Sequence, residues 1–252
     1  MPQTSAPSPA PVIERHRFEI KRRDLTILRK EMITPNMLRL VFKGADLEGF
    51  SSPSPDDHVK IFVPDGTGGE VMREYTPRFH DAERQEMWMD FALHDAGPAT
   101  LWAKEAKPGD RARIAGPRGS AVITGPIRSW VLIGDETALP AIARRIEELA
   151  PDTPVTSVVA VPGPQDEQTI TTRADHLSLW VHRDDPTDPA PLVTALESLT
   201  LPEQTFVWIA AEGSVARALR DCLSARGHML QWMKAAGYWV SGQADTSDKS
   251  LT

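Results

Sequence analysis

The chain has 252 residues, of which 40% are hydrophobic and 25% are charged, the composition of an ordinary globular protein with one or two domains. The 28 Lys and Arg residues and 35 Asp and Glu residues give a net charge of −7. This argues against nucleic acid as a partner, because phosphate binding needs a basic surface. Cys222 is the only cysteine, which excludes an intramolecular disulfide, a four-cysteine zinc site and a cysteine-ligated iron–sulfur cluster. No apolar run approaches the roughly 20 residues of a membrane helix, so we expect no membrane partner.

The N-terminal segment begins MPQTSAPSPAPV, which is rich in Pro, Ser and Ala and lacks the apolar centre of a signal peptide. We expect a disordered arm over residues 1–17. Residues 14–23 (ERHRFEIKRR) are basic, but acidic residues interrupt the run, which favours a solvated lead-in strand over a nucleic-acid or membrane patch. A cytoplasmic location is the default expectation, and nothing in the sequence requires more than a monomer.

Short runs rich in Val, Ile, Phe and Thr follow from Asp24 to Ile123, separated by Pro and Gly. This spacing predicts an antiparallel β-barrel over residues 18–127. The clearest runs are LTILRKEMI, NMLRLVF, HVKIFV, EVMREYT and EMWMDFALH. A helix is expected at residues 98–107, where Pro98 suits the first turn because its missing N–H would have no partner there.

Strands and helices alternate from Ser129 onward, which predicts a parallel-sheet α/β domain over residues 128–252. The expected strands are 130–134, 155–161, 176–182 and 206–211, and the expected helices are 138–150, 191–199 and 214–227. A β-barrel followed by an α/β domain of the nucleotide-binding type is the order of parts in ferredoxin-reductase-type flavoproteins, which is an analogy of fold only.

The hexapeptide 73–78 (REYTPR) is the first candidate for chemistry. On a strand, Arg73 and Tyr75 lie on one face, and Thr76 is held extended because a proline follows it. An arginine presents a planar fork to a diphosphate, and a tyrosine offers a flat ring to a flavin. A threonine hydroxyl or N–H can reach a flavin ring nitrogen. A strand with an exposed arginine and a half-buried tyrosine fits the hexapeptide equally well.

A second candidate lies where DFALH (90–94) meets the predicted helix that opens with GPATLWA (97–103). Free N–H groups at a helix start bind anions. Together with the Thr100 hydroxyl, they would hold a diphosphate opposite Arg73. The alternatives are a capping or surface role for His94 and packing of Trp102 on the barrel.

The turn 134–140 (GDETALP) follows the first strand of the α/β half and lacks the G-x-G-x-x-G fingerprint of a dinucleotide site. Asp135 and Glu136 would repel a phosphate there, although both carboxylates also suit the positive end of the next helix. We therefore expect no tightly held NAD in this domain, and a loosely held pyridine nucleotide that arrives and leaves stays open. Arg144 and Arg145 are candidates for contact with a 2′-phosphate, although solvated positions are the commoner case.

The chain resembles the siderophore-interacting protein family of FAD-dependent ferric-siderophore reductases, over about Asp24 to Gly242. The resemblance lies in REYTPR, DFALH, GPATLWA, KPGDRARIAGPRGS, GDETALPAI, AAEGSVARALR and GYW, taken in order. It implies FAD bound at the barrel and a ferric chelate reduced in a pocket near the flavin. It also implies electrons from NADPH or NADH or, in some members, from a ferredoxin.

Cofactor-binding positions follow from this resemblance. They are Arg73, Tyr75 and Thr76 in the flavin motif; Asp90, Phe91 and His94 beside the flavin; Ala99, Thr100 and Trp102 at the diphosphate-binding helix; Gly134, Asp135, Glu136 and Thr137 on the nicotinamide side; and Glu212 and Gly213 in the later turn at that cleft. Basic substrate-binding residues are implied at Lys60 and Arg118. The family continues GYW with arginines, whereas Val240 and Ser241 stand here, so Lys234 is the suggested substitute.

The expected activity is reduction of ferric siderophores by flavin, which takes two electrons together and gives them singly to Fe(III), releasing Fe(II). No G-x-S-x-G elbow or H-E-x-x-H motif occurs, so we expect neither a catalytic side chain nor a resident metal ion. Two other interpretations stay open. One is a general flavin reductase or ferredoxin–NADP reductase-like electron transferase, and the other is a non-catalytic siderophore-binding module.

Overall fold

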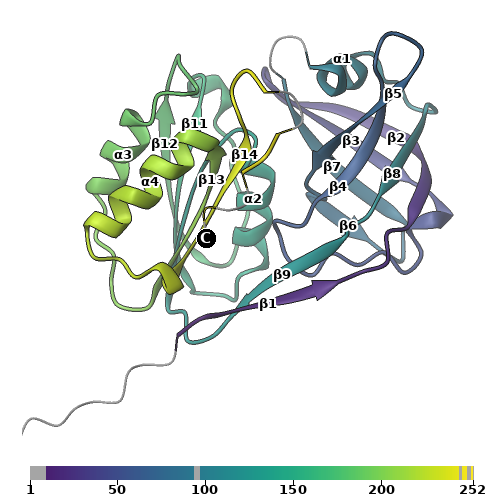
Figure 1. Ribbon diagram of the computed structural model, residues 1–252. Helices are drawn as coiled ribbons and strands as arrows, with labels where there is room; N and C mark the ends of the chain where they lie inside the picture. Colours follow the sequence, from purple (N-terminus) through teal and green to yellow (C-terminus); the bar gives the residue numbers. More distant parts are fainter. Residues whose placement is uncertain (1–9, 94–96, 244–245, 249–250, 252) are drawn as a thin grey trace, which may run out of the picture.

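The computed structural model describes residues 10–93, 97–243, 246–248 and 251. It has two halves that lie side by side: a set of antiparallel strands, and a parallel sheet between helices (Figure 1). His94, which belongs to the predicted flavin motif, lies outside the described residues. Every helix within the described ranges is too short or too polar to cross a membrane.

Seven strands of the first half form one antiparallel sheet in the order β5-β4-β8-β2-β3-β7-β6. Along β4, Val59, Ile61 and Val63 are buried, while Lys60 and Phe62 between them face the other side. Inward side chains of five strands meet in one core, so the sheet curls into the predicted barrel (Figure 1). The elements are β2 (Arg22–Thr34), β3 (Met37–Lys43), η1 (Ala45–Leu47), β4 (Val59–Pro64), β5 (Glu70–Tyr75), β6 (Phe79–Asp81), β7 (Glu86–Ala92) and β8 (Arg111–Ala115).

Helix α1 (Pro98–Glu105) covers one end of the barrel, where residues 98–107 predict a helix. Pro98 occupies its first turn, as expected from the missing N–H. Ala99 and Ala103 belong to the barrel core, and their small side chains let the helix lie close to the strand ends. The helix packs against β4, β3 and β7.

A two-stranded ribbon, β1 (Val12–Arg17) with β9 (Gly119–Thr124), runs beneath both halves (Figure 1). Ile13 packs against the core of the second half. This ordered strand differs from the disordered arm predicted for residues 1–17, because the backbone partners of β1 lie far along the chain, where local composition does not reveal them. Residues 1–9 lie outside the described ranges.

The second half contains a five-stranded parallel sheet in the order β12-β11-β10-β13-β14. One helix, α2, covers one face, and α3 and α4 cover the other, so the predicted α/β fold is confirmed (Figure 1). The sequence predicts four of the five strands and all three helices. The elements are β10 (Ser129–Asp135), α2 (Leu139–Glu148), β11 (Pro154–Val161), η2 (Pro164–Asp166), β12 (Asp175–His182), α3 (Ala190–Glu197), β13 (Thr205–Glu212), α4 (Gly213–Ala225), η3 (Leu230–Trp232) and β14 (Met233–Trp239).

The chain order of the parallel sheet reverses between β10 and β13. From β10 the chain moves outward to β11 and β12, and it then returns to the other side of β10 with β13. Ligands of open α/β sheets bind outside the carboxyl ends of the strands at such a reversal. Asp135 and Glu212 are the last residues of these two strands, so both stand at this position.

Two arginines fix α2 to the barrel. Arg78, which follows β5, donates from Nη1 and Nη2 to the Glu147 carboxylate at 2.7 and 2.5 Å. Arg144 of α2 donates from Nη1 to Ser52 Oγ at 2.9 Å and to the Pro77 carbonyl at 3.1 Å. These contacts hold the second half against the residues that directly follow the REYT segment.

Candidate functional site

The end of β5 presents the predicted flavin motif. Tyr75 is the last residue of this strand, and its ring centroid lies 4.3 Å from that of Phe91 on β7. Burial raises the pKa of the Tyr75 phenol far above its ordinary value, so it is a neutral ring and hydrogen-bond donor. Thr76 is buried next to it. Arg73 donates from Nη1 to the Met72 carbonyl at 2.8 Å.

Asp90, predicted to lie beside the flavin, is bound within the protein. Arg39 of β3 donates to both of its oxygens, from Nε at 2.6 Å and from Nη2 at 2.7 Å. The Arg78 guanidinium lies 3.9 Å from the same carboxylate. The side chain of Asp90 is 2% exposed. In the structure, Asp90 links β7 to β3 through Arg39.

Among the described residues, the start of α1 has backbone N–H donors without an intrahelical partner. The first intrahelical bond runs from Leu101 N to the Gly97 carbonyl at 3.0 Å, so the N–H groups of Ala99 and Thr100 precede the hydrogen-bonded ladder. Gly97 supplies no side-chain cap. Among the described residues, the buried hydroxyl of Thr100 also has no hydrogen-bond partner. A buried polar atom of this kind costs free energy unless something binds to it.

These features at the end of the barrel fit FAD. Trp102 of α1 lies 6.0 Å from Phe91, and Phe91 stacks on Tyr75, so three aromatic side chains connect the helix to β5. The flat Tyr75 ring suits an isoalloxazine, and the helix start with the unpartnered Thr100 hydroxyl suits a diphosphate. The two parts are therefore linked through the buried Phe91 ring at the same end of the barrel.

Gly134 and Asp135 are the last two residues of β10 and lie just before the start of α2. A Cβ on Gly134 would lie 2.4 Å from the Ala210 carbonyl oxygen, so glycine is needed here for strand packing. Asp135 Oδ1 accepts the Thr137 N–H at 2.9 Å. Its Oδ2 accepts the Glu212 N–H and the Trp239 indole N–H, both at 3.0 Å. Asp135 thereby ties the ends of β10, β13 and β14 together.

Glu136 forms an ion pair with Arg183, the residue after β12. Nη2 of Arg183 lies 3.0 Å from Glu136 Oε2 and 3.8 Å from Asp135 Oδ2. Burial raises the pKa of Glu136 to about 7, with a further contribution from the neighbouring Asp135, while Arg183 acts in the opposite direction. One guanidinium thus faces two carboxylates.

Glu212 caps α4. Its Oε2 accepts the N–H groups of Ser214 and Val215 at 2.6 and 3.2 Å, together with the Ser214 hydroxyl. Its Oε1 accepts the Ser241 N–H at 3.2 Å. Although burial alone would raise the pKa of Glu212, these hydrogen bonds lower it, so the carboxylate is charged. Gly213 begins α4 directly after it.

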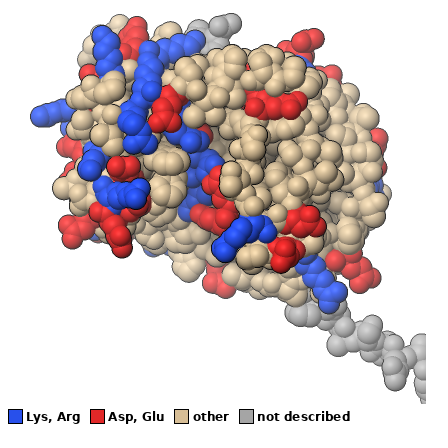
Figure 2. Space-filling view, turned by 180° about the vertical axis from the view of Figure 1, so that it is seen from behind, with Lys and Arg blue, Asp and Glu red and all other residues tan. Residues whose placement is uncertain are grey.

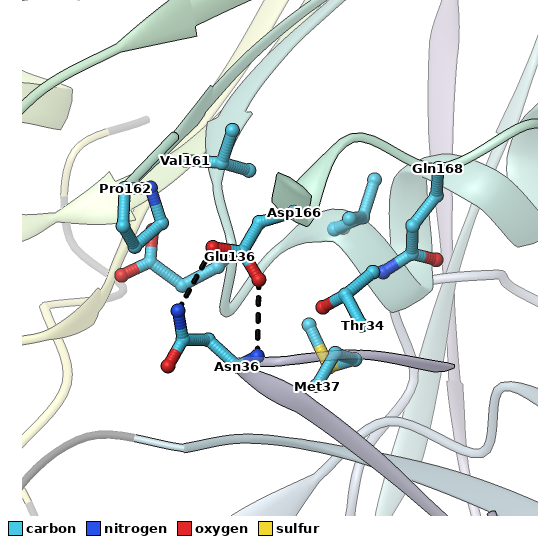
Figure 3. A pocket seen from close by; sticks show the side chains of 9 residues that line it. Thr34, Asn36, Met37, Glu136, Val161, Pro162, Asp166 and Gln168 are labelled. Carbon is cyan, nitrogen blue, oxygen red and sulfur yellow. Dashed lines mark hydrogen bonds between the residues drawn. The ribbon is translucent and has the colours of Figure 1, made fainter. Parts of the chain in front are cut away.

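Two cavities lie between the halves. The smaller cavity, about 10 Å³, is lined by Glu136, Asn36 and Asp166 among others. Asn36 donates its backbone N–H to Asp166 at 3.0 Å and its side-chain amide to the same carboxylate at 2.8 Å (Figure 3). The larger, about 310 Å³, lies between Trp88 of the barrel and Glu147 of α2. The carboxyl edge of the sheet is therefore in direct contact with the β2–β3 turn.

The three predicted substrate residues have different surroundings. Lys60 of β4 is 41% exposed in its side chain, and its Nζ lies 4.0 Å from Glu74 Oε1. Arg118 is exposed before β9. Lys234 of β14 forms an ion pair with Asp56, and its side chain is 15% exposed. Lys60 and Arg118 thus keep solvent access, whereas Lys234 is committed to the contact between the halves.

The structure gathers the predicted cofactor residues into two groups. Tyr75, Thr76, Phe91, Ala99, Thr100 and Trp102 lie at the barrel end, and Gly134 to Thr137, Glu212 and Gly213 lie at the carboxyl edge of the sheet. Their ligand roles stay predictions. Sequence reasoning missed the partners Arg39, Arg183 and Asp166, because each acts on a residue distant in the chain. Arg145, a 2′-phosphate candidate, lies over the Trp130 ring at 4.9 Å.

Two family sequence models match the chain. The one described as "Siderophore-interacting FAD-binding domain" matches residues 26–71 and 66–121, and the one described as "Siderophore-interacting protein" matches residues 127–242. The chain is 32% identical over 248 residues to the NADPH-dependent ferric-chelate reductase of Escherichia coli K12, which covers 90% of this chain and 96% of that protein.

Solved structures agree. The crystal structure of a siderophore utilization protein from T. fusca matches with a TM-score of 0.84 and 34% identity, over 94% of this chain and 98% of that one. The ferredoxin reductase in carbazole 1,9a-dioxygenase shares the fold alone, with a TM-score of 0.67 and 18% identity, over 86% of this chain and 69% of that one.

The flavin-binding barrel and the doubly wound sheet define a flavin-dependent oxidoreductase with a ferredoxin-reductase-like fold. More narrowly, the matches over both halves confirm the resemblance found in the motifs. The chain belongs to the siderophore-interacting protein family.

Proposed function

We propose that this chain reduces ferric siderophores or related ferric chelates, with FAD as its cofactor and NADPH or NADH as its electron donor. One observation carries the proposal. The FAD-binding family match covers the barrel, and the start of α1 at the barrel end carries a buried hydroxyl, that of Thr100, without a partner among the described residues. The similarity to an NADPH-dependent ferric-chelate reductase supports the substrate and the donor.

The chain's own residues would hold and orient the cofactor. Tyr75 offers a neutral flat ring that Phe91 supports from behind, and Thr76 adds a hydroxyl at the strand end. Thr100 and the neighbouring N–H groups would bind the diphosphate, with Arg73 as the opposing charge. FAD, when bound, supplies the conversion of a two-electron hydride into single electrons that Fe(III) accepts.

Lys60 and Arg118 would attract the chelate, because ferric complexes of catecholates and hydroxycarboxylates are often anionic. A local basic site can attract an anion despite the net charge of −7. Lys234 is a weaker candidate, since Asp56 already neutralises its charge within the protein. No side chain of this chain has to act as a nucleophile or base.

We also propose a separate role for each half: residues 18–127 bind FAD, and residues 128–252 bind the electron donor. The turn at Gly134–Thr137 and the turn at Glu212 and Gly213 flank the strand-order reversal, where a nicotinamide would approach. A ferredoxin is the alternative donor, and a chain that NADPH and NADH both fail to reduce would favour it.

Anaerobic visible spectra of the purified protein test the proposal. The protein as isolated should be yellow, should bleach on addition of NADPH or NADH, and should regain its colour when a ferric chelate is added, with Fe(II) trapped by a colorimetric chelator. A colourless protein that does not bind added FAD would contradict the cofactor assignment and the activity together.

The same spectra separate the two alternatives. Turnover of free flavin or ferredoxin, with ferric chelates left unreduced, would favour a general flavin reductase or a ferredoxin–NADP reductase-like transferase. A protein that binds the chelate but transfers no electron to it after photochemical reduction would be a siderophore-binding module.

A further inference from the structure

The carboxyl edge of the parallel sheet is acidic. Residues 1–127 contain 18 Lys and Arg and 18 Asp and Glu, whereas residues 128–252 contain 10 and 17, so the net charge of −7 lies in the second half. Viewed from behind, Lys and Arg gather over the barrel half (Figure 2). The acidic residues at the edge are Asp135, Glu136, Asp166, Glu167, Asp184, Asp185, Asp188 and Glu212.

Carboxylates of the chain occupy the helix starts at this edge. Asp135 accepts the Thr137 N–H before α2 at 2.9 Å, and Asp188 accepts the Ala190 N–H of α3 at 2.9 Å. Glu212 likewise accepts two N–H groups of α4. These N–H groups are the ones that hold phosphates in nucleotide-binding sheets. A donor phosphate would therefore meet carboxylates where such folds usually offer free amides.

Arg183 is a basic group beside the turn after β10, and its Nη2 lies 3.0 Å from Glu136 Oε2. The Arg183 side chain is 4% exposed, whereas that of Glu136 is 21% exposed and lines the small cavity between the halves (Figure 3). Glu136 is therefore the more accessible member of the pair. A phosphate that approaches the guanidinium has to displace this carboxylate. Asp135, whose Oδ2 lies 3.8 Å from Arg183 Nη2, would still repel the phosphate.

We propose that Glu136 is a specificity-determining residue for the electron donor: by holding Arg183, it keeps phosphate-bearing donors loosely bound, and most of all those with a 2′-phosphate. This inference rests on the proposed function, because it takes a pyridine nucleotide as the donor. The expected consequence is a high KM for NADPH with rapid release of NADP⁺, without any change in the chemical step.

Calorimetric titration of the flavin-loaded protein with NADP⁺ tests this without turnover. At about pH 8, above the Glu136 pKa of about 7, Glu136→Gln should bind NADP⁺ about three- to tenfold more tightly, because one of the two carboxylate charges that oppose the phosphate is gone. Glu136→Asp keeps the charge and should stay closer to the wild type. Glu197→Gln, on the opposite edge of the sheet, removes an exposed charge equally and should change nothing. Equal or weaker binding by Glu136→Gln would overturn the proposal.

The wild type gives a second test that needs no variant. A repulsive edge predicts that NADP⁺ binds no more weakly when salt rises from about 20 to about 200 mM, because salt screens the repulsion. A marked loss of affinity with salt, as at a basic phosphate site, would contradict the proposal. Reduction of a ferric chelate by the photoreduced protein uses no nucleotide, so its failure would count against the proposed function alone.

Discussion

Arg144 of α2 donates a hydrogen bond to the carbonyl of Pro77, the residue that directly follows Thr76 of the flavin motif. The same guanidinium also donates to the Ser52 hydroxyl and carbonyl, at 2.9 and 2.5 Å. The orientation of the second half is thereby tied to the strand end that we propose holds the flavin.

Replacing Arg144 by Met should lower the free energy of unfolding by about 2–4 kcal/mol, because three buried acceptors of the barrel lose their donor. Urea denaturation measures this loss, and FAD retention should fall with it. Arg84→Met is the control, since its side chain is 77% exposed and its contact with Asp81 is a surface ion pair. Equal effects of both variants would show that the Arg144 contacts do not stabilise the protein.

Removing the Thr100 hydroxyl should have opposite effects on the stability of the apoprotein and on the affinity for FAD. Thr100→Val should leave the apoprotein as stable or more stable by about 1 kcal/mol, because a buried unpartnered hydroxyl is removed. The dissociation constant for FAD should rise about tenfold, because a hydrogen bond to a charged diphosphate is lost. Thermal unfolding of the apoprotein and fluorescence titration with FAD measure the two effects.

Thr34→Val provides the matched control. Its hydroxyl is also buried without a partner among the described residues, but it lies at the end of β2 and lines the small cavity beside Glu136. This variant should gain stability similarly and bind FAD like the wild type. An unchanged FAD affinity in Thr100→Val would contradict the proposed diphosphate site.

Adjacent aspartates should respond to pH with opposite signs. Burial raises the pKa of Asp57 to about 6, so its carboxyl destabilises the fold increasingly as pH rises from about 4 to about 6. Asp57→Asn should therefore become more stable than the wild type over this window, by about 1–3 kcal/mol above pH 6. Urea unfolding at several pH values measures the difference.

Asp56 behaves in the reverse way. Although burial alone would raise the pKa of Asp56, the Lys234 ammonium lowers it below its ordinary value. The pair therefore stabilises the protein above the unfolded-state pKa of Asp56, and this stabilisation is lost as pH falls through the folded-state pKa. Asp56→Asn should be less stable than the wild type at neutral pH by about 3 kcal/mol, and the deficit should shrink in acid. The same sign for both variants would refute this assignment.

Lys60 and Lys234 should separate substrate attraction from stability. Lys60→Ala should raise the KM for an anionic ferric citrate complex about three- to tenfold and affect a neutral ferric trihydroxamate less, because the loss is electrostatic. Lys234→Ala should chiefly lower the unfolding free energy, because Asp56 loses its partner. Steady-state kinetics with both chelates and urea unfolding distinguish them, and equal effects of Lys60→Ala on both chelates would remove its electrostatic role.

Local periodicity was enough to predict most of the architecture. The helix α2 and the strand β13 are short segments with a clear burial pattern, and the order of strands and helices limits the sheet to a parallel one. The strand β14 was not predicted, because MKAAGYW has small residues and no alternation of apolar and polar side chains. Its strand character comes from pairing with β13.

The candidate site was predictable in its motifs but not in its partners. The REYTPR and GPATLWA segments stand out in the sequence, and the structure places the Tyr75 and Trp102 rings both next to Phe91. Nothing local to Lys234 shows that Asp56 neutralises it, or that Arg183 faces Glu136. Such pairs depend on tertiary packing between distant segments, which a single sequence does not encode in any local pattern.

The ribbon of β1 and β9 has a consequence for biosynthesis. Val12 is paired with Thr124, so β1 leaves the ribosome long before its partner strand has been made. Until then its backbone N–H and C=O groups are hydrogen-bonded to water, and Ile13 cannot pack on the core of the second half, which is translated later still. Closure of this ribbon therefore has to wait until β9 has been made, and holdase chaperones or proteases would have access to β1 of the nascent chain until then.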